Sequence, residues 1–504
     1  MQQERIKDII IVGGGTAGWM TAAALAHSLD HDQYSVTLVE SDLIGIIGVG
    51  EATIPAIHEF NQLLGIDEKE FMRKTNASFK LGIEFVNWRR QGESYIHPFG
   101  PFGQPMNGAG FHHFWVKMRQ AGDDFSFEDY SMPITAARAG KFDYPLADPR
   151  SPRSTYQYAF HFDAGLYARY LREWSEARGV ERIEGKVTDI AQNGESGFIE
   201  SITLESGQRI PGQLFIDCTG FRGLLIEQTL KAGFDDWSHW LPCNSAAPLP
   251  TENSGPPIPH TRATALTAGW QWRIPLQHRT GNGHVYCNEF ISDDEAAQML
   301  LDNAAGRPLA EPRLLRFTTG RRRKAWVKNC VAVGLSGGFL EPLESTAIYL
   351  IQSAIMKLIR NFPGAYINPV EAEEFNRQVN NKYDQVRNLI ILHYKQNERG
   401  DTPFWEYCRN MSIPEELQHR IELFRHRGHV AHKPSELFNE PSWLAVLIGQ
   451  GVIPERYDRR ADGLPESEIR QRMAQIRNII RQAEEAMPSH QDTIARNCAS
   501  EAMA

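Results

Sequence analysis

The pattern of apolar and polar residues predicts alternating strands and helices near the N-terminus. Residues Asp8–Val12 are β-branched and apolar, as in a buried parallel strand, and the stretch WMTAAALAHSL that follows soon after has the composition of a helix. Residues Ser35–Val39 predict a second strand. Further on, Leu214–Gly220 and Cys330–Gly334 are apolar stretches that end in glycine. This order is typical of an α/β fold.

The pattern changes in the middle of the chain and again near its end. Gly269–Pro275, with the sequence GWQWRIP, alternates large apolar with polar residues, and its proline disfavours helix at the preceding residue. It therefore predicts an extended strand with Trp270, Trp272 and Ile274 on one face. After Leu350 the chain becomes helical, and it ends in the amphipathic stretch RQRMAQIRNIIRQAEEA.

Composition indicates a globular protein with a large core. The chain has 504 residues, of which 41% are hydrophobic and 23% charged, enough for two packed domains or one elaborated domain. A formal net charge of -9 gives no general attraction to nucleic acid or to an anionic membrane surface. The basic run Arg321–Lys324 is short and is interpreted as a solvated turn before a strand.

Cysteine spacing and the N-terminus indicate a reducing compartment. The six cysteines form no CxxC pair and are expected to be free thiols. The first residues lack the long apolar region of a secretory signal, and no uninterrupted apolar stretch is long enough to span a bilayer. We therefore expect a cytoplasmic protein without a membrane or nucleic-acid partner.

A candidate nucleotide site follows the first strand. The sequence GGGTAG at residues 13–18 is a GxGxxG motif between a strand and a helix, where glycines allow the backbone to approach a pyrophosphate. Glu40 ends the second strand and is placed to accept hydrogen bonds from a ribose. The loop residues expected to contact the dinucleotide are Gly13, Gly14, Gly15, Thr16 and Ala17.

The identity of the dinucleotide rests on the later strands. Leu214–Gly220 and Cys330–Gly334 resemble the second and third nucleotide-contacting strands of flavoprotein monooxygenases, which favours FAD over NAD. The chain contains no second complete GxGxxG with an acidic partner, so a site for a nicotinamide reductant is not apparent. We expect the flavin to be reduced by another protein.

Two further motifs resemble those of the flavin-dependent halogenases. GWQWRIP matches the signature GWxWxIP of that family, which related hydroxylases lack, and FLEPLESTA matches FxxPxxSxG except that Ala347 replaces the last glycine. The resemblance covers most of the chain and includes GVGEATIP at Gly48–Pro55 and Lys80 in FKLGIEFVNW. It implies that FADH2, oxygen and chloride or bromide produce hypohalous acid, which passes through a tunnel to an electron-rich aromatic substrate such as an indole derivative.

The resemblance also implies roles for individual residues. Trp270 and Trp272 would form a wall of the tunnel and keep the organic substrate away from the oxidising flavin. Lys80 would hydrogen-bond the hypohalous acid or form a haloamine, and the sequence leaves both open. Without the resemblance, the tryptophans would be interpreted as packing residues and Lys80 as a surface lysine.

The FLEPLESTA segment carries the other implied catalytic residues. Glu344 matches the catalytic glutamate of the family, with Ser345 supporting it, and the backbone amides of Thr346 and Ala347 match the halide site. The methyl group of Ala347 is expected to narrow this site or to change halide preference. A Glu-rich segment that caps a helix is the alternative interpretation, and it suits Glu341 better than Glu344. Further FAD contacts implied by the resemblance are Ala52, Val187, Leu335 and Ile348.

The substrate site is less defined by the sequence. By the resemblance, His97 and Phe99 would stack on the arene, the alternative being a proline-glycine loop with a buried aromatic residue. Residues around Ser442–Leu444 do not supply the tyrosines and glutamate with which tryptophan-specific members bind the amino-acid backbone. An indole-like or phenolic compound is therefore favoured over tryptophan itself.

The expected protein is an α/β flavoenzyme in two parts. Residues 1–355 form a Rossmann-type FAD-binding domain of the flavoprotein monooxygenase kind with an inserted mixed-sheet substrate region, and residues 356–504 form a helical subdomain that covers the substrate. Its partners would be a separate NAD(P)H-dependent flavin reductase and a small aromatic substrate; no metal is expected, and the sequence leaves a homodimer open. An aromatic hydroxylase that uses FAD is the alternative, and an inactive flavin- or indole-binding protein is a third.

Overall fold

The chain forms two compact units, each assembled from three separate segments. The computed structural model describes residues 5–42, 50–433 and 435–500. The first unit contains Met1–Asn76, Phe162–Ser238 and Phe317–Asp384, and the second contains Ala77–His161, His239–Arg316 and Gln385–Ala504. The predicted division into a FAD-binding part, 1–355, and a helical part, 356–504, stays a prediction.

The first unit is built on a mostly parallel sheet. Among the described residues its strand order is β20-β21-β12-β1-β2-β8. The strands are β20 Trp326–Val327, β21 Cys330–Ala332, β12 Leu214–Asp217, β1 Asp8–Val12, β2 Ser35–Glu40 and β8 Glu181–Glu184. All neighbouring pairs are parallel except β20 with β21. The strands predicted from the apolar stretches are thus confirmed, together with the α/β fold class.

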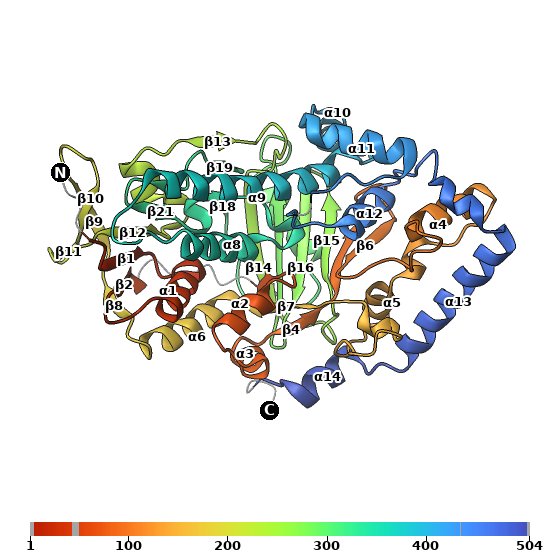
Figure 1. Cartoon of the computed structure of the whole chain (residues 1–504), viewed down its shortest axis with the longest axis horizontal. Coiled ribbons are helices and arrows are strands. Elements are labelled where there is room, and N and C mark those ends of the chain that lie inside the picture. The colour runs from red at the N-terminus through yellow and green to blue at the C-terminus, as the bar shows by residue number, and fades with distance from the viewer. Residues whose placement is uncertain (1–4, 43–49, 434, 501–504) are drawn as a thin grey trace. The chain divides into compact units, whose positions relative to one another are not determined.

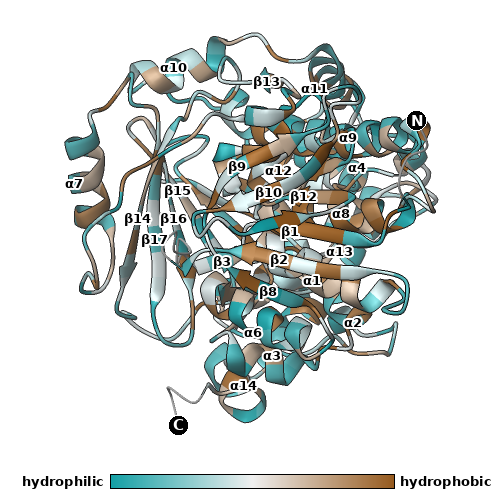
Figure 2. Ribbon diagram, turned by 90° about the vertical axis from the view of Figure 1, so that its left-hand side faces the viewer, coloured by the Kyte–Doolittle hydropathy of each residue, from teal (hydrophilic) through white to brown (hydrophobic). Residues whose placement is uncertain are grey.

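Both faces of this sheet are covered, which is why β1 is apolar and buried from Ile9 to Val12. Helices α1 (Thr16–Ser28) and α6 (Ala164–Glu176) pack together beside β1 and β2 (Figure 1). On the other face, Ile10 and Val12 belong to a core cluster with residues of a small antiparallel sheet. That sheet consists of β9 Val187–Gln192, β10 Ile199–Leu204 and β11 Arg209–Pro211. Figure 2 shows the apolar strands β1 and β12 inside these layers.

The remaining elements of the first unit surround the sheet. They are β3 Gly50–Ala52, α2 Ile57–Leu63, α3 Glu68–Lys74, η4 Gly220–Arg222, the π-helix η5 Leu224–Thr229, β13 Phe234–Asp236, β19 Gly320–Arg322, η6 Gly334–Ser336, β22 Gly338–Phe339, η7 Pro342–Glu344 and α8 Ala347–Arg360. Helix α9, Pro369–Lys395, begins in this unit and continues into the second.

The basic run is only in part the solvated turn before a strand that the sequence predicts, because Arg323 and Lys324 are exposed ahead of β20 whereas the first two arginines are not. Arg321 and Arg322 lie in strand β19, and Arg322 is buried with its Nη1 3.0 Å from Glu227 Oε2. Arg321 forms ion pairs with two aspartates: its Nη2 lies 3.5 Å from Asp235 Oδ2, and its Nε lies 3.6 Å from Asp384 Oδ1. The acidic partners come from other segments, so a local reading of the run could not identify them.

The second unit is built on the predicted mixed sheet. Among the described residues its order is β18-β14-β17-β16-β15-β5-β6, antiparallel except for β5 beside β15. The strands are β18 Leu315–Arg316, β14 Ser245–Thr251, β17 Thr280–Tyr286, β16 Gly269–Pro275, β15 Thr261–Leu266, β5 Gly82–Val86 and β6 Ser94–Pro98. Helix α7 (Asp293–Asn303) packs against β14 and β17 (Figure 2).

Helices from residues 77–161 and from residues 385–504 complete the second unit. Helix α13 runs beside α4 and α5, and α12 lies on β6 (Figure 1). The helical elements are α4 Phe111–Gln120, η2 Phe127–Tyr130, α5 Met132–Arg138, η3 Pro152–Ser154, α10 Pro403–Asn410, α11 Glu415–Arg427, α12 Glu440–Gly449, η8 Arg459–Gly463, α13 Glu466–Glu485 and α14 His490–Asn497. The chain is thus helical after Leu350, as its sequence pattern predicts. Within the described ranges, none of the helices has the length and apolar character needed to cross a membrane.

Candidate functional site

The glycine loop between β1 and α1 has the geometry of a pyrophosphate cradle. Gly13 has a φ of 112°, and a Cβ there would lie 2.3 Å from the carbonyl oxygen of Cys218. A Cβ on Gly18 would lie 1.8 Å from the carbonyl oxygen of Gly13. A Cβ on Gly15, in contrast, would meet no atom within 4 Å. The first and third glycines thus allow the turn and the helix packing, and the second leaves open space in which a ligand can approach the backbone.

Replacing Gly15 by alanine is expected to weaken FAD binding without destabilising the protein. The new methyl group meets no protein atom, but it enters the space that a pyrophosphate would occupy, and such overpacking costs about 1–3 kcal/mol. The dissociation constant for FAD should rise about 10- to 100-fold with an unchanged melting temperature. Gly13→Ala is the matched control, because it should lower the melting temperature as well. Unaltered FAD affinity in Gly15→Ala would remove the loop from the cofactor site.

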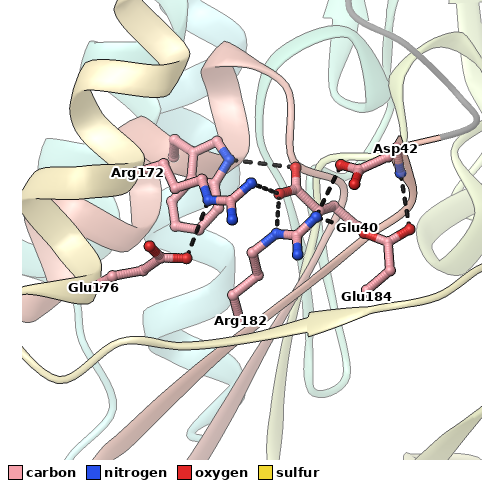
Figure 3. A network of polar contacts seen from close by, with 7 residues as sticks. Glu40, Asp42, Arg172, Glu176, Arg182 and Glu184 are labelled. Atoms are coloured by element: carbon pink, nitrogen blue, oxygen red, sulfur yellow. Dashed lines mark hydrogen bonds and ion pairs between the residues drawn. The ribbon is translucent and has the colours of Figure 1, made fainter.

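Glu40 ends β2 beside this loop, in a network that orients its carboxylate (Figure 3). Its Oε1 accepts a hydrogen bond of 2.5 Å from Arg182 Nε and lies 3.5 Å from Arg172 Nη1. Its Oε2 accepts from Trp19 Nε1 at 3.3 Å and lies over Gly14, where a Cβ would be 1.5 Å away. Oε1 is therefore held by guanidinium groups and Oε2 is directed to the loop, as an acceptor for a ribose requires.

The two arginines of this network were not identified from the sequence. Arg172 comes from α6 and also contacts Glu176, and Arg182 comes from β8 and also contacts Asp42 and Glu184 (Figure 3). No motif links these positions to Glu40, because the parallel pairing of β2 with β8 brings Arg182 to it and a separate helix, α6, supplies Arg172.

The other predicted FAD contacts all belong to the first unit. Ala52 ends β3, Val187 begins β9, Leu335 lies in η6 with 36% of its surface exposed, and Ile348 lies in the first turn of α8. Gly334, beside Leu335, has a φ of 77°, and a Cβ there would lie 2.7 Å from that of Ala17. The end of β21 is thus packed closely on α1. The contacts of these residues with FAD stay predictions, and Gly48 and Val49 lie outside the described residues.

The segment at Phe339–Leu350 is not one continuous helix. It contains the short helix η7, then Ser345 in the left-handed conformation with a φ of 57°, then α8. This conformation costs a non-glycine residue about 1–3 kcal/mol, and such residues cluster at functional sites. Ser345 Oγ is buried and has no hydrogen-bond partner among the described residues, so it is one of the buried polar groups whose role needs an explanation.

Glu344 and the start of α8 lie on either side of Ser345. Glu344 is 1% exposed, and Thr346 is the N-cap of α8, with Ala347 as its first residue. The first N–H groups of a helix have no acceptor inside it and favour an anion. The alternative, a capping segment, is not supported: neither Glu341 at η7 nor Thr346 at α8 makes a side-chain cap bond. The catalytic and halide-binding roles stay predictions.

Lys80 lies in the second unit and is completely buried. It ends β4 (Ser78–Lys80), which pairs antiparallel with β7 (Ala159–Asp163), and its Nζ lies 5.1 Å from the centre of the Phe99 ring. The interpretation of Lys80 as a surface lysine is therefore wrong. A buried ammonium over an aromatic face is a desolvated donor, suited to act on a small polar reagent.

His97 and Phe99, predicted to stack on the substrate, lie at the end of one strand. His97 is 3% exposed in β6, and Phe99 follows the strand and is half-buried. The ring of His97 lies 6.1 Å from that of Phe438, a neighbour that sequence reasoning missed. His97 is thus a strand residue, not a loop residue, and stacking on a substrate stays a prediction.

The tryptophan strand is extended, as predicted. Trp270 and Trp272 lie on one face of β16, with ring centres 6.2 Å apart at 60°. A Cβ on Gly283, directly opposite Trp272, would lie 2.0 Å from its ring, so this glycine makes room for the indole. Trp270 also lies 6.4 Å from Trp88 in an aromatic cluster. Their role as a tunnel wall stays a prediction.

A chain of hydrogen bonds connects the lysine strand to the tryptophan strand. Ser78 Oγ donates to the carbonyl oxygen of Pro275 at 2.6 Å, so it accepts from His161 Nδ1 at 3.1 Å. His161 Nε2 then accepts from Thr261 Oγ1 at 2.9 Å. This arrangement requires a neutral imidazole. Burial and, secondarily, the charge of Lys80 lower the pKa of His161 well below its usual value.

The buried histidines near Lys80 should make stability depend on pH. His490, whose Nε2 accepts from Phe79 N–H, has its pKa lowered to about 4 by burial. The unfolded chain binds protons near pH 6.5, before the folded protein, so the free energy of unfolding should fall as the pH falls from 6.5 to 4. The share of His490 is about 3 kcal/mol.

Denaturant unfolding between pH 7 and pH 4.5 measures this effect. The slope of unfolding free energy against pH should be shallower in His490→Gln, which has no titrating group at this position. Equal slopes in the two proteins would show that His490 does not contribute.

Comparisons with known proteins give a consistent result. Residues 8–466 match the sequence model of the tryptophan halogenase family. The tryptophan 6-halogenase ThaL of Streptomyces albogriseolus is 38% identical over 89% of this chain and 90% of its own length.

Two solved structures are similar over nearly the whole chain. Xcc4156, a flavin-dependent halogenase from Xanthomonas campestris, has 48% identity and a TM-score of 0.95, covering 98% of this chain and 99% of its own. BrvH, a flavin-dependent halogenase from Brevundimonas sp. BAL3, has 44% identity and a TM-score of 0.94 with the same coverage.

Proposed function

The chain belongs to the tryptophan halogenase family, and on this premise we propose that it halogenates an electron-rich aromatic such as an indole derivative, using FADH2, oxygen and chloride or bromide. The observation that carries the proposal is the buried ammonium of Lys80 beside Phe99. A flavin-dependent halogenase needs such a donor for hypohalous acid. The alternative of an aromatic hydroxylase receives no support from the similar proteins.

The first unit would hold the cofactor. The open space at Gly15 and the oriented carboxylate of Glu40 suit the pyrophosphate and a ribose of FAD, respectively. When bound and reduced, FAD supplies with oxygen the oxidising equivalent that turns halide into hypohalous acid. Members of this family receive reduced flavin from a separate reductase, and we expect an NAD(P)H-dependent enzyme in that role.

Lys80 would hold the hypohalous acid and direct its halogen to the arene. Its ammonium is removed from water, so a hydrogen bond that it donates is stronger than one at the surface. Phe99, 5.1 Å from the ammonium, would present its ring to the arene.

The start of α8 would serve the halide and the developing charge. The N–H groups of Thr346 and Ala347 suit a halide ion, and Ser345 Oγ, buried without a partner in the described structure, supplies a further donor. The carboxylate of Glu344 would stabilise positive charge on the ring as it is halogenated, or accept its proton.

An indole-like compound is a better candidate than tryptophan. Arg420 lies over the Trp443 ring at 4.1 Å and forms two hydrogen bonds, of 2.9 and 2.7 Å, with Glu436. Trp443 Nε1 donates to the carbonyl oxygen of Phe438. The polar side chains of this segment thus bind one another, which supports a substrate without an amino-acid backbone.

The test supplies purified protein with FAD, a flavin reductase, NADH, oxygen and indole. Reactions with chloride, with bromide and without halide are compared by mass spectrometry. A halogen isotope pattern that requires halide is the expected result, and the two salts give the preference. Oxygenated product without halide would indicate the hydroxylase, and absence of halogenated product over a panel of arenes, tryptophan included, would contradict the proposal.

A further inference from the structure

The strand that carries Lys80 is very short and depends on distant segments for its position. Strand β4 has three residues and lies at the edge of its sheet, paired with β7 on one side only. An edge strand leaves backbone groups unpaired on its outer side. Two side chains, those of His490 and Gln277, hydrogen-bond backbone groups of residues just before Lys80.

His490, the first residue of α14, holds the backbone directly next to Lys80. Its Nε2 accepts the N–H of Phe79 at 3.0 Å, and its Nδ1 donates to the carbonyl oxygen of Pro257 at 2.7 Å. The imidazole is 1% exposed. It therefore acts as a neutral bridge between the lysine strand and the segment before β15.

Gln277 links the same strand to the residues that follow α14. Its Nε2 donates to the carbonyl oxygens of Ala77 and Cys498, at 2.6 and 3.0 Å. Its Oε1 accepts the N–H of Ser500 at 2.8 Å. Gln277 is 4% exposed, so water does not substitute for these bonds. The backbone is thus connected to the C-terminal segment at Phe79 within β4 and at Ala77 just before it.

We propose that residues 489–500 together with Gln277 form a positioning element for halogen transfer, in which His490 and Gln277 hold β4 so that the Lys80 ammonium stays at its place over Phe99. This inference rests on the proposed function of Lys80. A displacement of about 1 Å of a reacting group can cost about 100-fold in rate. Loss of the Phe79 hydrogen bond acts one residue away from Lys80, so it changes the direction of the lysine side chain.

The experiment compares His490→Leu, which removes both hydrogen bonds, with His490→Gln, whose amide supplies an acceptor and a donor. Two rates are measured, the halogenation of the arene and the halogenation of a small scavenger of free hypohalous acid. In His490→Leu, kcat for the arene should fall about 10- to 100-fold, with KM, FAD affinity and the scavenger rate within about twofold. His490→Gln should restore most of the arene rate.

Controls separate positioning from general loosening. Gln491→Leu places the same apolar residue on an exposed position of α14 and should leave both rates unchanged. If His490→Leu does not fold, Gln277→Met is used instead, because it removes the hydrogen bonds from Gln277 to Ala77, Cys498 and Ser500. It should likewise lower the arene rate and leave the scavenger rate unchanged. The inference would be overturned if His490→Leu halogenated the arene as fast as the unmodified protein does, or if it lost arene and scavenger halogenation to the same extent. Absence of halide-dependent product from the unmodified protein would count against the proposed function instead.

Discussion

Replacing Lys80 with alanine is expected to reduce arene halogenation by about 10³-fold or more, because the only group assigned to hold and deliver the electrophile is removed. FAD should bind as before, since the glycine loop belongs to the first compact unit and Lys80 to the second. The rate is measured by chromatography with detection of the halogenated product, and FAD binding by flavin fluorescence.

The alanine variant also leaves a cavity, because Lys80 is completely buried. Lys80→Met is the matched control, since it fills the space without an ammonium. Both variants should lose activity to a similar extent, although Lys80→Met should melt at the higher temperature. Activity in Lys80→Met close to that of the unmodified protein would show that Lys80 contributes volume and not chemistry, and loss of FAD would assign it a structural role.

Replacing Glu344 with glutamine is expected to slow halogenation by about 10²- to 10⁴-fold. The amide has nearly the same shape, so the buried site should keep its structure, but it carries no negative charge and accepts no proton. The melting temperature and FAD affinity should change little. The measurement is kcat at saturating arene and halide.

Glu341→Gln provides the matched control, because Glu341 is also buried and lies in the same segment. Its replacement should leave kcat within about threefold of the unmodified value, whereas Glu344→Gln should not. Near-normal turnover in Glu344→Gln, or the same loss in both variants, would contradict the role assigned to Glu344.

The nucleotide site illustrates what a local pattern contains. Gly13, Gly15 and Gly18 lie in and just after the turn between β1 and α1. Their spacing in the sequence therefore fixes their positions in the turn, and the nucleotide site can be predicted from it. Glu40 was predicted at the end of β2 for the same reason. Arg172 and Arg182, which orient its carboxylate, come from α6 and β8 and have no signal of their own.

The backbone conformation of Ser345 could not be predicted from the local sequence pattern. The segment at Phe339–Leu350 has the composition of a core helix. Ser345 nevertheless adopts the left-handed backbone conformation, just before α8 begins. Propensity favours a right-handed conformation for serine, and the surrounding packing overrides it. The unpartnered buried hydroxyl is visible only in the folded chain.

The sequence by itself determined the α/β fold, the strand-turn-helix nucleotide motif, the extended tryptophan strand and the halogenase signatures, because each is written in neighbouring residues. Only the tertiary structure decided that Lys80 is buried over Phe99 and that His490 binds the strand beside it. The physical reason is that burial and hydrogen-bond partners of a three-residue edge strand are supplied by segments far away in the sequence, and no local pattern encodes them.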